Sequence, residues 1–211
     1  MIKYSEFNNM EIIVDKKSKK TELILETSLL LFSQKGFYST TMPDIAKEMN
    51  MSVGNFYNYF SSKESLAREL IKYSSDKVGS MIREVNETQC NSEEKIKKIV
   101  TLYFNLAVEK PQYLDYFLRV YLANKEIFKD GCEGMICVAS FVTEMMIFFE
   151  EGVRKGELRN QNFFSAFGLF MGYLGGFVFL NGENILEDSL NSFVDDVSHN
   201  IYRALKTHED S

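Results

Sequence analysis

A chain of 211 residues with 45% hydrophobic residues can bury a sizeable core, which indicates a folded protein rather than a disordered one. Two prolines and twelve glycines, without a hairpin signal, favour an all-α fold over a turn-rich β fold. The net charge of -6 by itself argues against nucleic-acid binding, but residues 16–73 hold nine Lys/Arg and six Asp/Glu, a net of +3. Residues 74–211 hold fourteen Lys/Arg and twenty-one Asp/Glu, a net of -7, so the N-terminal part of the chain is basic and the rest is acidic.

Cysteine and histidine are too scarce for a disulfide framework or a zinc site. The chain has Cys90, Cys132 and Cys137, and its histidines are His199 and His208. We therefore expect no metal and no cofactor. The N-terminal residues are too polar for a signal peptide, which predicts a cytoplasmic protein.

The first predicted helix covers residues 18–35 and ends at Gly36. Its apolar and small residues recur at spacings of three and four and fall on one face: Ile24, Thr27, Ser28, Leu31 and Phe32.

Two short helices are predicted next. Thr41 stands three residues before Asp44, the spacing of a capping box, and opens a helix that runs to about residue 48. Asn50 can take the left-handed conformation of a sharp turn, and Ser52 can cap a helix over residues 53–59.

Ser61 and Glu64 predict a second capping box, which opens a long helix to about residue 87. Two short helices joined by a tight turn, with a third packed behind them, form a helix-turn-helix arrangement.

Residues 20–66 resemble the DNA-binding domain of the TetR family of bacterial transcriptional regulators. The resemblance includes the run "LFSQKGFYSTTMPDIA", the segment "MSVGNFYNYF" and the opening "SSKESL" of the long helix. It covers about a quarter of the chain. The family usually has glycine at the position of Asn50, and asparagine also accepts the left-handed turn.

Each side chain of the short helix receives a predicted role. Phe56 and Phe60 lie four apart and pin the helix to the core, whereas the other residues face DNA. Val53 can contact a thymine methyl group, and Gly54 allows a close backbone approach to a phosphate. The predicted DNA-binding residues are Thr41, Lys47, Ser52, Val53, Gly54, Asn55, Tyr57, Asn58, Tyr59 and Lys63.

Within that set, Tyr57 and Tyr59 are assigned to phosphates, and Asn55 and Asn58 to base edges. Asn55 has the alternative role of supporting the cap at Ser52. Flanking phosphate contacts are also expected from a lysine cluster, Lys16, Lys17, Lys19 and Lys20, which is otherwise a solvated tail.

The second half predicts helices at residues 93–109, 111–122, 135–155, 162–182 and 186–206, which makes nine in all. Residues 160–182 carry no charge and are long enough to cross a bilayer. A helix that is apolar all round can instead be buried between subunits. We favour a dimer helix, with Gly168, Gly172, Gly175 and Gly176 at the interface, and keep a membrane span as the alternative.

Seventeen of the twenty-nine Phe and Tyr residues lie between Tyr103 and Phe179. The resemblance implies a pocket for a small apolar or aromatic ligand, and ordinary core packing is the alternative for each residue. The predicted pocket residues are Tyr103, Tyr113, Phe117, Tyr121, Phe141, Met145 and Phe148. Cys132 and Cys137 are read either as a redox pair or as small buried residues.

The sequence predicts an N-terminal tail (1–15), a helix-turn-helix domain (16–65) and a ligand-binding and dimerisation domain (66–211). The expected function is that of a homodimeric repressor that binds a palindromic operator in double-stranded DNA and is released by a small-molecule effector. The alternatives are a helical enzyme and a membrane-associated regulator. The enzyme lacks support, because no nucleophile-base pair and no phosphate loop is visible in the sequence.

Overall fold

The computed structural model describes residues 4–123, 125–128 and 136–207. Within them the regular elements are helices, nine of them α-helices, and a single antiparallel bridge joins Leu158 to Lys206. The all-α prediction is therefore confirmed. The chain forms two compact units, Met1–Tyr73 with Asp115–Glu133 and Ser74–Leu114 with Gly134–Ser211.

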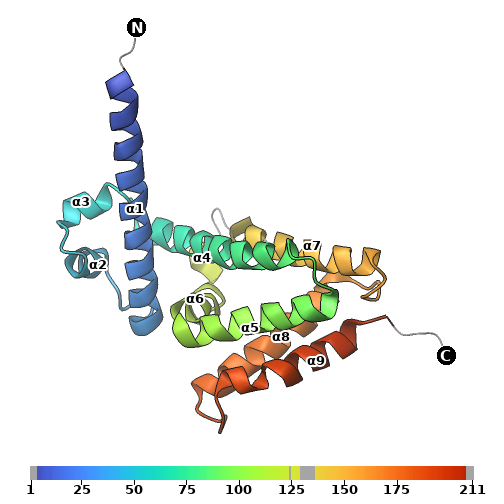
Figure 1. The fold of residues 1–211 in the computed structure, drawn as a ribbon. Coiled ribbons are helices and arrows are strands. Elements are labelled where there is room, and N and C mark those ends of the chain that lie inside the picture. Colours follow the sequence, from blue (N-terminus) through green and yellow to red (C-terminus); the bar gives the residue numbers. More distant parts are fainter. Residues whose placement is uncertain (1–3, 124, 129–135, 208–211) are drawn as a thin grey trace. The chain divides into compact units, whose positions relative to one another are not determined.

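The first unit contains three N-terminal helices, the first half of a long helix and two short irregular ones. In chain order these are α1 (Tyr4–Lys35), α2 (Met42–Glu48), α3 (Val53–Tyr57), α4 (Lys63–Asn86, of which residues 63–73 belong here), the π-helical η1 (Tyr116–Tyr121) and the 3-10 helix η2 (Lys125–Phe128). The first helix begins well before the predicted start at residue 18. Figure 1 shows α2 and α3 beside α1.

Local capping forms the turns of this unit. Thr41 and Asp44 make the predicted capping box, and Asn50 has a φ of 52°, the predicted left-handed conformation. Ser52 accepts a hydrogen bond from the Asn55 amide, as a helix cap does.

The predicted capping box of Ser61 and Glu64 is wrong. The start of α4 is capped one residue later, because the Ser65 amide donates to Ser62 Oγ at 3.0 Å and the Ser62 amide donates to Ser65 Oγ at 3.2 Å. Serine supplies both side chains of this reciprocal pair, so a search for Glu or Gln at the third position misses it.

Aromatic rings fill the core of the first unit. Phe32, Phe56 and Tyr116 are fully buried, and the Phe32 and Tyr116 rings stack with centroids 6.2 Å apart. The Tyr116 hydroxyl donates to the Ala67 carbonyl oxygen at 2.9 Å. Residues from three separate parts of the chain therefore hold the helix-turn-helix together.

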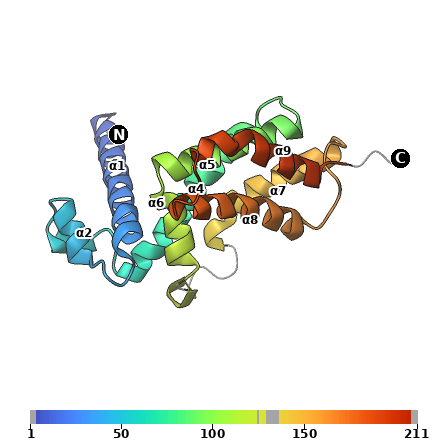
Figure 2. The ribbon, with the colours of Figure 1, turned by 90° about the horizontal axis from the view of Figure 1, so that it is seen from below.

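The second unit contains the rest of α4 and the C-terminal helices. These are α5 (Ser92–Glu109), α6 (Gln112–Asp115, of which Asp115 belongs to the first unit), the 3-10 helix η3 (Ile136–Val138), α7 (Ala139–Arg154), α8 (Phe163–Gly182), the 3-10 helix η4 (Leu190–Phe193) and α9 (Val194–Leu205). Figure 2 shows α5 beside α9, and the two helices are in contact.

Several helix boundaries differ from the predictions: α3 ends at Tyr57 instead of residue 59, and α7 begins at Ala139 instead of residue 135. Helix α5 begins at Ser92, one residue before the predicted start, because Asn91 caps it in a capping box with Glu94. The helix predicted over residues 111–122 divides into α6 and η1. The last helix begins at Val194 instead of residue 186, because residues 190–193 form a separate 3-10 turn.

Buried charges in the second unit are paired across long stretches of sequence. Glu144 is 3% exposed and accepts a hydrogen bond from Arg83 Nε at 2.7 Å. Lys95 is 2% exposed, and its ammonium donates to Glu151 at 2.8 Å and to the Asn86 carbonyl oxygen at 2.7 Å. These pairs join α4, α5 and α7, as buried charges require partners.

Candidate nucleic-acid interface

The short helix α3 presents an uncharged polar surface to solvent. Phe56 and Phe60 are buried as predicted, with ring centroids 6.4 Å apart, and they fix the rotation of the helix. The remaining positions face outward: Ser52, Val53, Gly54, Asn55, Tyr57 and Asn58 are exposed, whereas Tyr59 is half-buried. The exposed amides, hydroxyl and methyl groups are of the kinds that contact base edges and phosphates in DNA.

The cap at the start of α3 determines which polar groups of Ser52 and Asn55 can still bind DNA. Ser52 Oγ accepts from the Asn55 backbone amide at 3.3 Å, so the cap uses this oxygen as an acceptor and leaves its O–H able to donate. The side chain of Asn55 is not needed for that bond, because the donor is its backbone. Asn55 therefore supports the cap and still has its carboxamide available.

Thr41 and Asp44 form a tight local pair at the start of α2. The Thr41 hydroxyl donates to Asp44 Oδ2 at 2.6 Å, and the Thr41 amide donates to the same oxygen at 2.8 Å. These two hydrogen bonds lower the pKa of the Asp44 carboxyl below its usual value. Lys47, at the other end of α2, is exposed.

Lys63 has a different environment from the one its predicted phosphate contact requires. Its ammonium donates to the carbonyl oxygens of Phe37 at 2.9 Å and Thr40 at 3.1 Å, and lies 4.3 Å from the centre of the Phe37 ring. The side chain thus closes the turn between α1 and α2. A phosphate contact from Lys63 stays a prediction and would need some of these bonds to be shared or exchanged.

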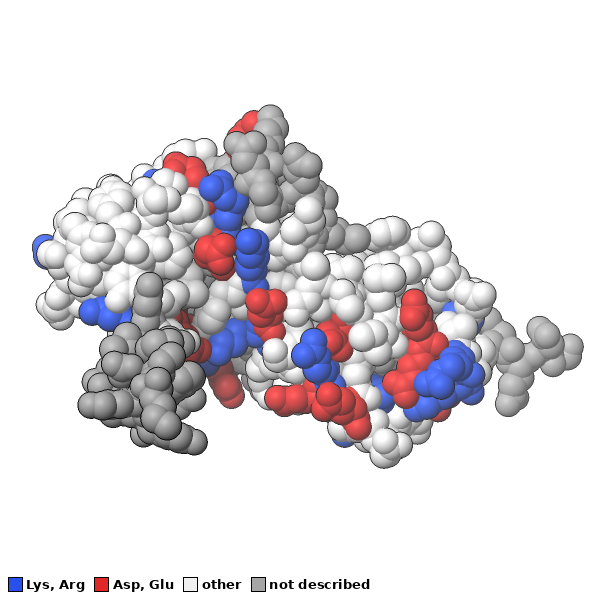
Figure 3. Space-filling view, turned by 90° about the horizontal axis from the view of Figure 1, so that it is seen from above, with Lys and Arg blue, Asp and Glu red and all other residues white. Residues whose placement is uncertain are grey.

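The structure describes only two of the four side chains in the predicted lysine cluster. Lys19 and Lys20 are exposed on α1, whereas the side chains of Lys16 and Lys17 lie outside the described residues. On the face shown in Figure 3, basic side chains alternate with acidic ones and form no continuous basic patch.

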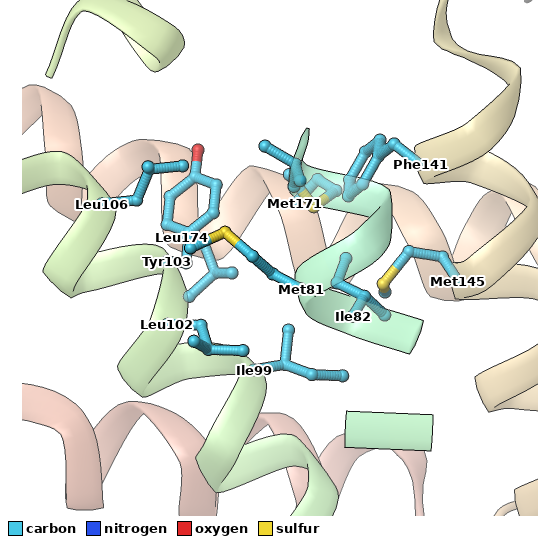
Figure 4. Close-up of a pocket in the computed structure, with 11 residues that line it drawn as sticks. Met81, Ile82, Ile99, Leu102, Tyr103, Leu106, Phe141, Met145, Met171 and Leu174 are labelled. Carbon is cyan, nitrogen blue, oxygen red and sulfur yellow. The ribbon is translucent and has the colours of Figure 1, made fainter. Parts of the chain in front are cut away.

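The second unit contains a narrow apolar cavity between α4, α5, α7 and α8 (Figure 4). Its volume is about 20 Å³, room for about one water molecule. The lining residues are Val78, Met81, Ile82, Ile99, Leu102, Tyr103, Leu106, Phe141, Met145, Met171 and Leu174. Burial raises the pKa of Tyr103 to about 12, so its hydroxyl stays protonated at neutral pH.

The structure brings three of the seven predicted pocket residues together at this cavity, Tyr103, Phe141 and Met145. Tyr113 and Phe148 are buried in the second unit without lining it. Phe117 and Tyr121 belong to the first unit, where their rings stack with centroids 5.4 Å apart.

The sequence reasoning missed the methionines of this cavity, Met81 and Met171. The predicted set consists of six aromatic residues and Met145, whereas flexible methionines are the side chains that most readily vacate space in a core. Each is the one methionine of its helix, α4 or α8, so no spacing pattern in the sequence marks it. Cys132 lies outside the described residues, and Cys137 is buried.

The outer face of α8 is apolar and open. Phe164 and Phe179 are 59% and 61% exposed, and a Cβ atom added at Gly168, Gly172, Gly175 or Gly176 would meet no atom within 4 Å. Packing within this chain therefore does not explain the glycines. By length and hydropathy, α8 is the one helix in the described part of the chain that could span a membrane.

Comparison with known proteins agrees with the helix-turn-helix. Residues 24–70 match the family profile described as bacterial regulatory proteins, tetR family. The chain is 35% identical over 101 residues, 48% of its length and 35% of the relative, to the uncharacterized HTH-type transcriptional regulator YuxN of Bacillus subtilis (strain 168). It is 26% identical over 198 residues, 84% of its length and 62% of the relative, to YerO, an uncharacterized HTH-type transcriptional regulator of the same strain.

The chain thus spans less than two thirds of the length of either relative. Among solved structures, a crystal structure of the transcriptional regulator FadR from Bacillus subtilis in complex with stearoyl-CoA superposes with a TM-score of 0.72. The match covers 85% of this chain and 96% of that chain at 18% identity, which shows a shared fold.

Proposed function

We propose that the chain is a homodimeric, sequence-specific repressor of transcription of the TetR family, because residues 24–70 match that family's profile and the relatives are described as transcriptional regulators. The observation that carries the proposal is the surface of α3. A helix held by Phe56 and Phe60 presents Val53, Asn55 and Asn58 outward without a competing charge. Such groups read base edges in the major groove, while flanking side chains contact phosphates.

The outer face of α8 supports a dimer. Four glycines in one helix cost about 1 kcal/mol each in helix propensity relative to alanine, and their own chain gives no packing reason for them. A second copy of α8 lying against this face would bury the exposed phenylalanines and use the close approach that glycine permits. A two-fold dimer presents two copies of α3, so the operator is a palindrome.

The cavity in the second unit supports an apolar effector. Its lining is apolar apart from the Tyr103 hydroxyl, and three methionines can change rotamer to enlarge it. FadR, whose fold is similar, was crystallised with stearoyl-CoA, a molecule with a long apolar chain. We propose that an apolar ligand enters by displacing these side chains and, because α4 lines the cavity and continues into the first unit, weakens DNA binding.

Repression is the sign of regulation that we propose, because a dimer bound across a promoter occupies DNA that RNA polymerase needs. A cytoplasmic location follows from this function. The membrane alternative predicts that α8 requires detergent, so a chain that stays dimeric in detergent-free buffer contradicts it.

Selection of DNA from a genomic fragment pool by the purified chain tests the function. We expect enrichment of a palindromic sequence whose half-sites lie about 34–36 Å apart or a multiple of that spacing, bound more weakly as salt rises. Gly172→Leu should yield monomers in sedimentation and lose operator affinity. Enrichment of no sequence, or of single half-sites at saturating protein, would contradict the proposal.

A further inference from the structure

A groove lies on the surface of the second unit, between the end of α7 and the start of α8. It has a volume of about 360 Å³, which falls within the usual range of about 300–1,000 Å³ for small-molecule sites. Its apolar lining consists of Met146, Phe149, Val153, Phe163 and Ala166. No residue of this groove lines the cavity between α4 and α8, so the two are separate sites.

The polar side of the groove carries two arginines without counter-ions. Arg154 and Arg159 are exposed, and neither forms an ion pair with another residue that the structure describes. Asn160 and Gln161 add two carboxamides, and Glu150 adds one negative charge. The groove therefore has one net positive charge in a chain whose net charge is -6.

The arginine side of the groove is held in place before anything binds. The Arg159 amide donates to the Leu205 carbonyl oxygen at 2.9 Å, and Leu158 forms the bridge to Lys206. Asn162 caps α8 by accepting from the Ser165 amide at 3.2 Å, and the positive end of the helix dipole faces this linker. An anchored backbone lowers the entropy cost of binding.

We propose that this groove binds an amphipathic monocarboxylate, with its acyl chain on the α7–α8 floor and its carboxylate on Arg154 and Arg159. Guanidinium groups match carboxylate geometry with two parallel hydrogen bonds. One net positive charge suits a single carboxylate better than a polyphosphate. The groove volume of about 360 Å³ suits an acyl chain of medium length, such as that of decanoate.

Calorimetric titration of the full chain with decanoate, below its micelle concentration, tests the proposal. Replacing both arginines (Arg154→Gln with Arg159→Gln) should weaken decanoate binding by about 10- to 100-fold, because each charged hydrogen bond is lost. Decanol, which has the same chain and no charge, should bind the two proteins equally. Arg203→Gln, an exposed arginine on α9 outside the groove, should change neither affinity.

A steric variant gives a second arm. Val153→Trp fills the apolar floor and should weaken decanoate and decanol alike. Decanoate binding that survives the double arginine replacement would place the ligand elsewhere and overturn the proposal. Absence of decanoate binding, with a shift of the monomer-dimer equilibrium in the double variant, would make the groove a contact with a second copy and also overturn it.

Discussion

The two units of the molecule are stabilised by polar contacts of different kinds. In the first unit, hydrogen bonds between residues three apart cap the helices, as Thr41 does with Asp44, and Lys63 donates to the carbonyl oxygens of Phe37 and Thr40. In the second unit, buried charges are paired across the sequence, as Lys95 is with Glu151. The difference teaches that the helix-turn-helix depends on caps and on hydrogen bonds to backbone carbonyls over an apolar core, whereas the second unit depends on ion pairs between distant parts of the chain.

The largest effect is expected from a substitution in the apolar core under α3. Phe56→Ala removes a fully buried ring and should cost about 3–5 kcal/mol of unfolding free energy, together with operator binding. Asn58→Ala, on the exposed side of the same turn, should change stability by less than about 0.5 kcal/mol. Denaturant unfolding measures both, and equal losses would mean that Phe56 does not anchor the helix.

The next effect concerns the ion pairs of the second unit. Glu151→Ala leaves the buried Lys95 ammonium with only the Asn86 carbonyl oxygen and should destabilise by about 3 kcal/mol. Lys95→Met should cost less, because Glu151 keeps its partner Lys155 at 2.7 Å. Thermal unfolding measures the loss of stability in each variant. A larger loss in Lys95→Met than in Glu151→Ala would show that the unpaired Lys95 ammonium is not what destabilises the Glu151 variant.

The Lys95–Glu151 ion pair also predicts how the stability of the protein depends on pH in the acid range. Hydrogen bonds from Lys155 and Lys95 lower the pKa of Glu151 from its ordinary value of 4.5, so the folded state binds this proton less readily than the unfolded chain. Its contribution to stability is complete above pH 4.5 and is lost as pH falls through the lowered folded pKa. Glu151→Gln should therefore flatten the stability curve below pH 4.5, and an unchanged curve would contradict this assignment.

A smaller effect tests the local caps. Thr41→Ala removes the capping box of α2 and should cost about 1 kcal/mol, with Thr41→Ser as the matched control that restores most of it. If the alanine variant loses operator affinity while its stability is restored by a stabilising solute, Thr41 also contacts DNA. Affinity that recovers with stability would assign it to the cap alone.

The smallest effect is confined to the surface. A hydrogen bond from Lys98 at 3.0 Å lowers the pKa of the Cys90 thiol below its ordinary value of 9.0. Iodoacetamide should therefore alkylate Cys90 with a pH midpoint below 9.0, and Lys98→Ala should move the midpoint up. Operator binding should not change in either case. A midpoint that Lys98→Ala leaves unchanged would contradict a hydrogen bond between Lys98 and Cys90.

The fold could be predicted where the signals are local. The turns could be predicted from Thr41, Asn50 and Ser52, because helix caps and left-handed residues act on residues three or four positions away. The Ser62–Ser65 cap was missed because serine at both positions departs from the usual pattern.

The second unit was harder to predict for a physical reason. Which aromatic residues meet at one cavity depends on how helices cross, so Phe117 and Tyr121 were grouped with residues of the other unit. Lys63 was assigned to DNA because its carbonyl partners lie 26 and 23 residues away, beyond any local pattern.

The central claim is that α3 reads base sequence, and one measurement tests it most directly. Selection of DNA sites from a random pool by the wild-type chain, by Tyr57→Phe and by Asn58→Ala compares preference with affinity. The account predicts that Tyr57→Phe weakens binding to all sequences and keeps the selected palindrome, whereas Asn58→Ala relaxes or changes specific base positions in each half-site. An unchanged palindrome from Asn58→Ala would contradict the assignment of α3 to base readout through this residue.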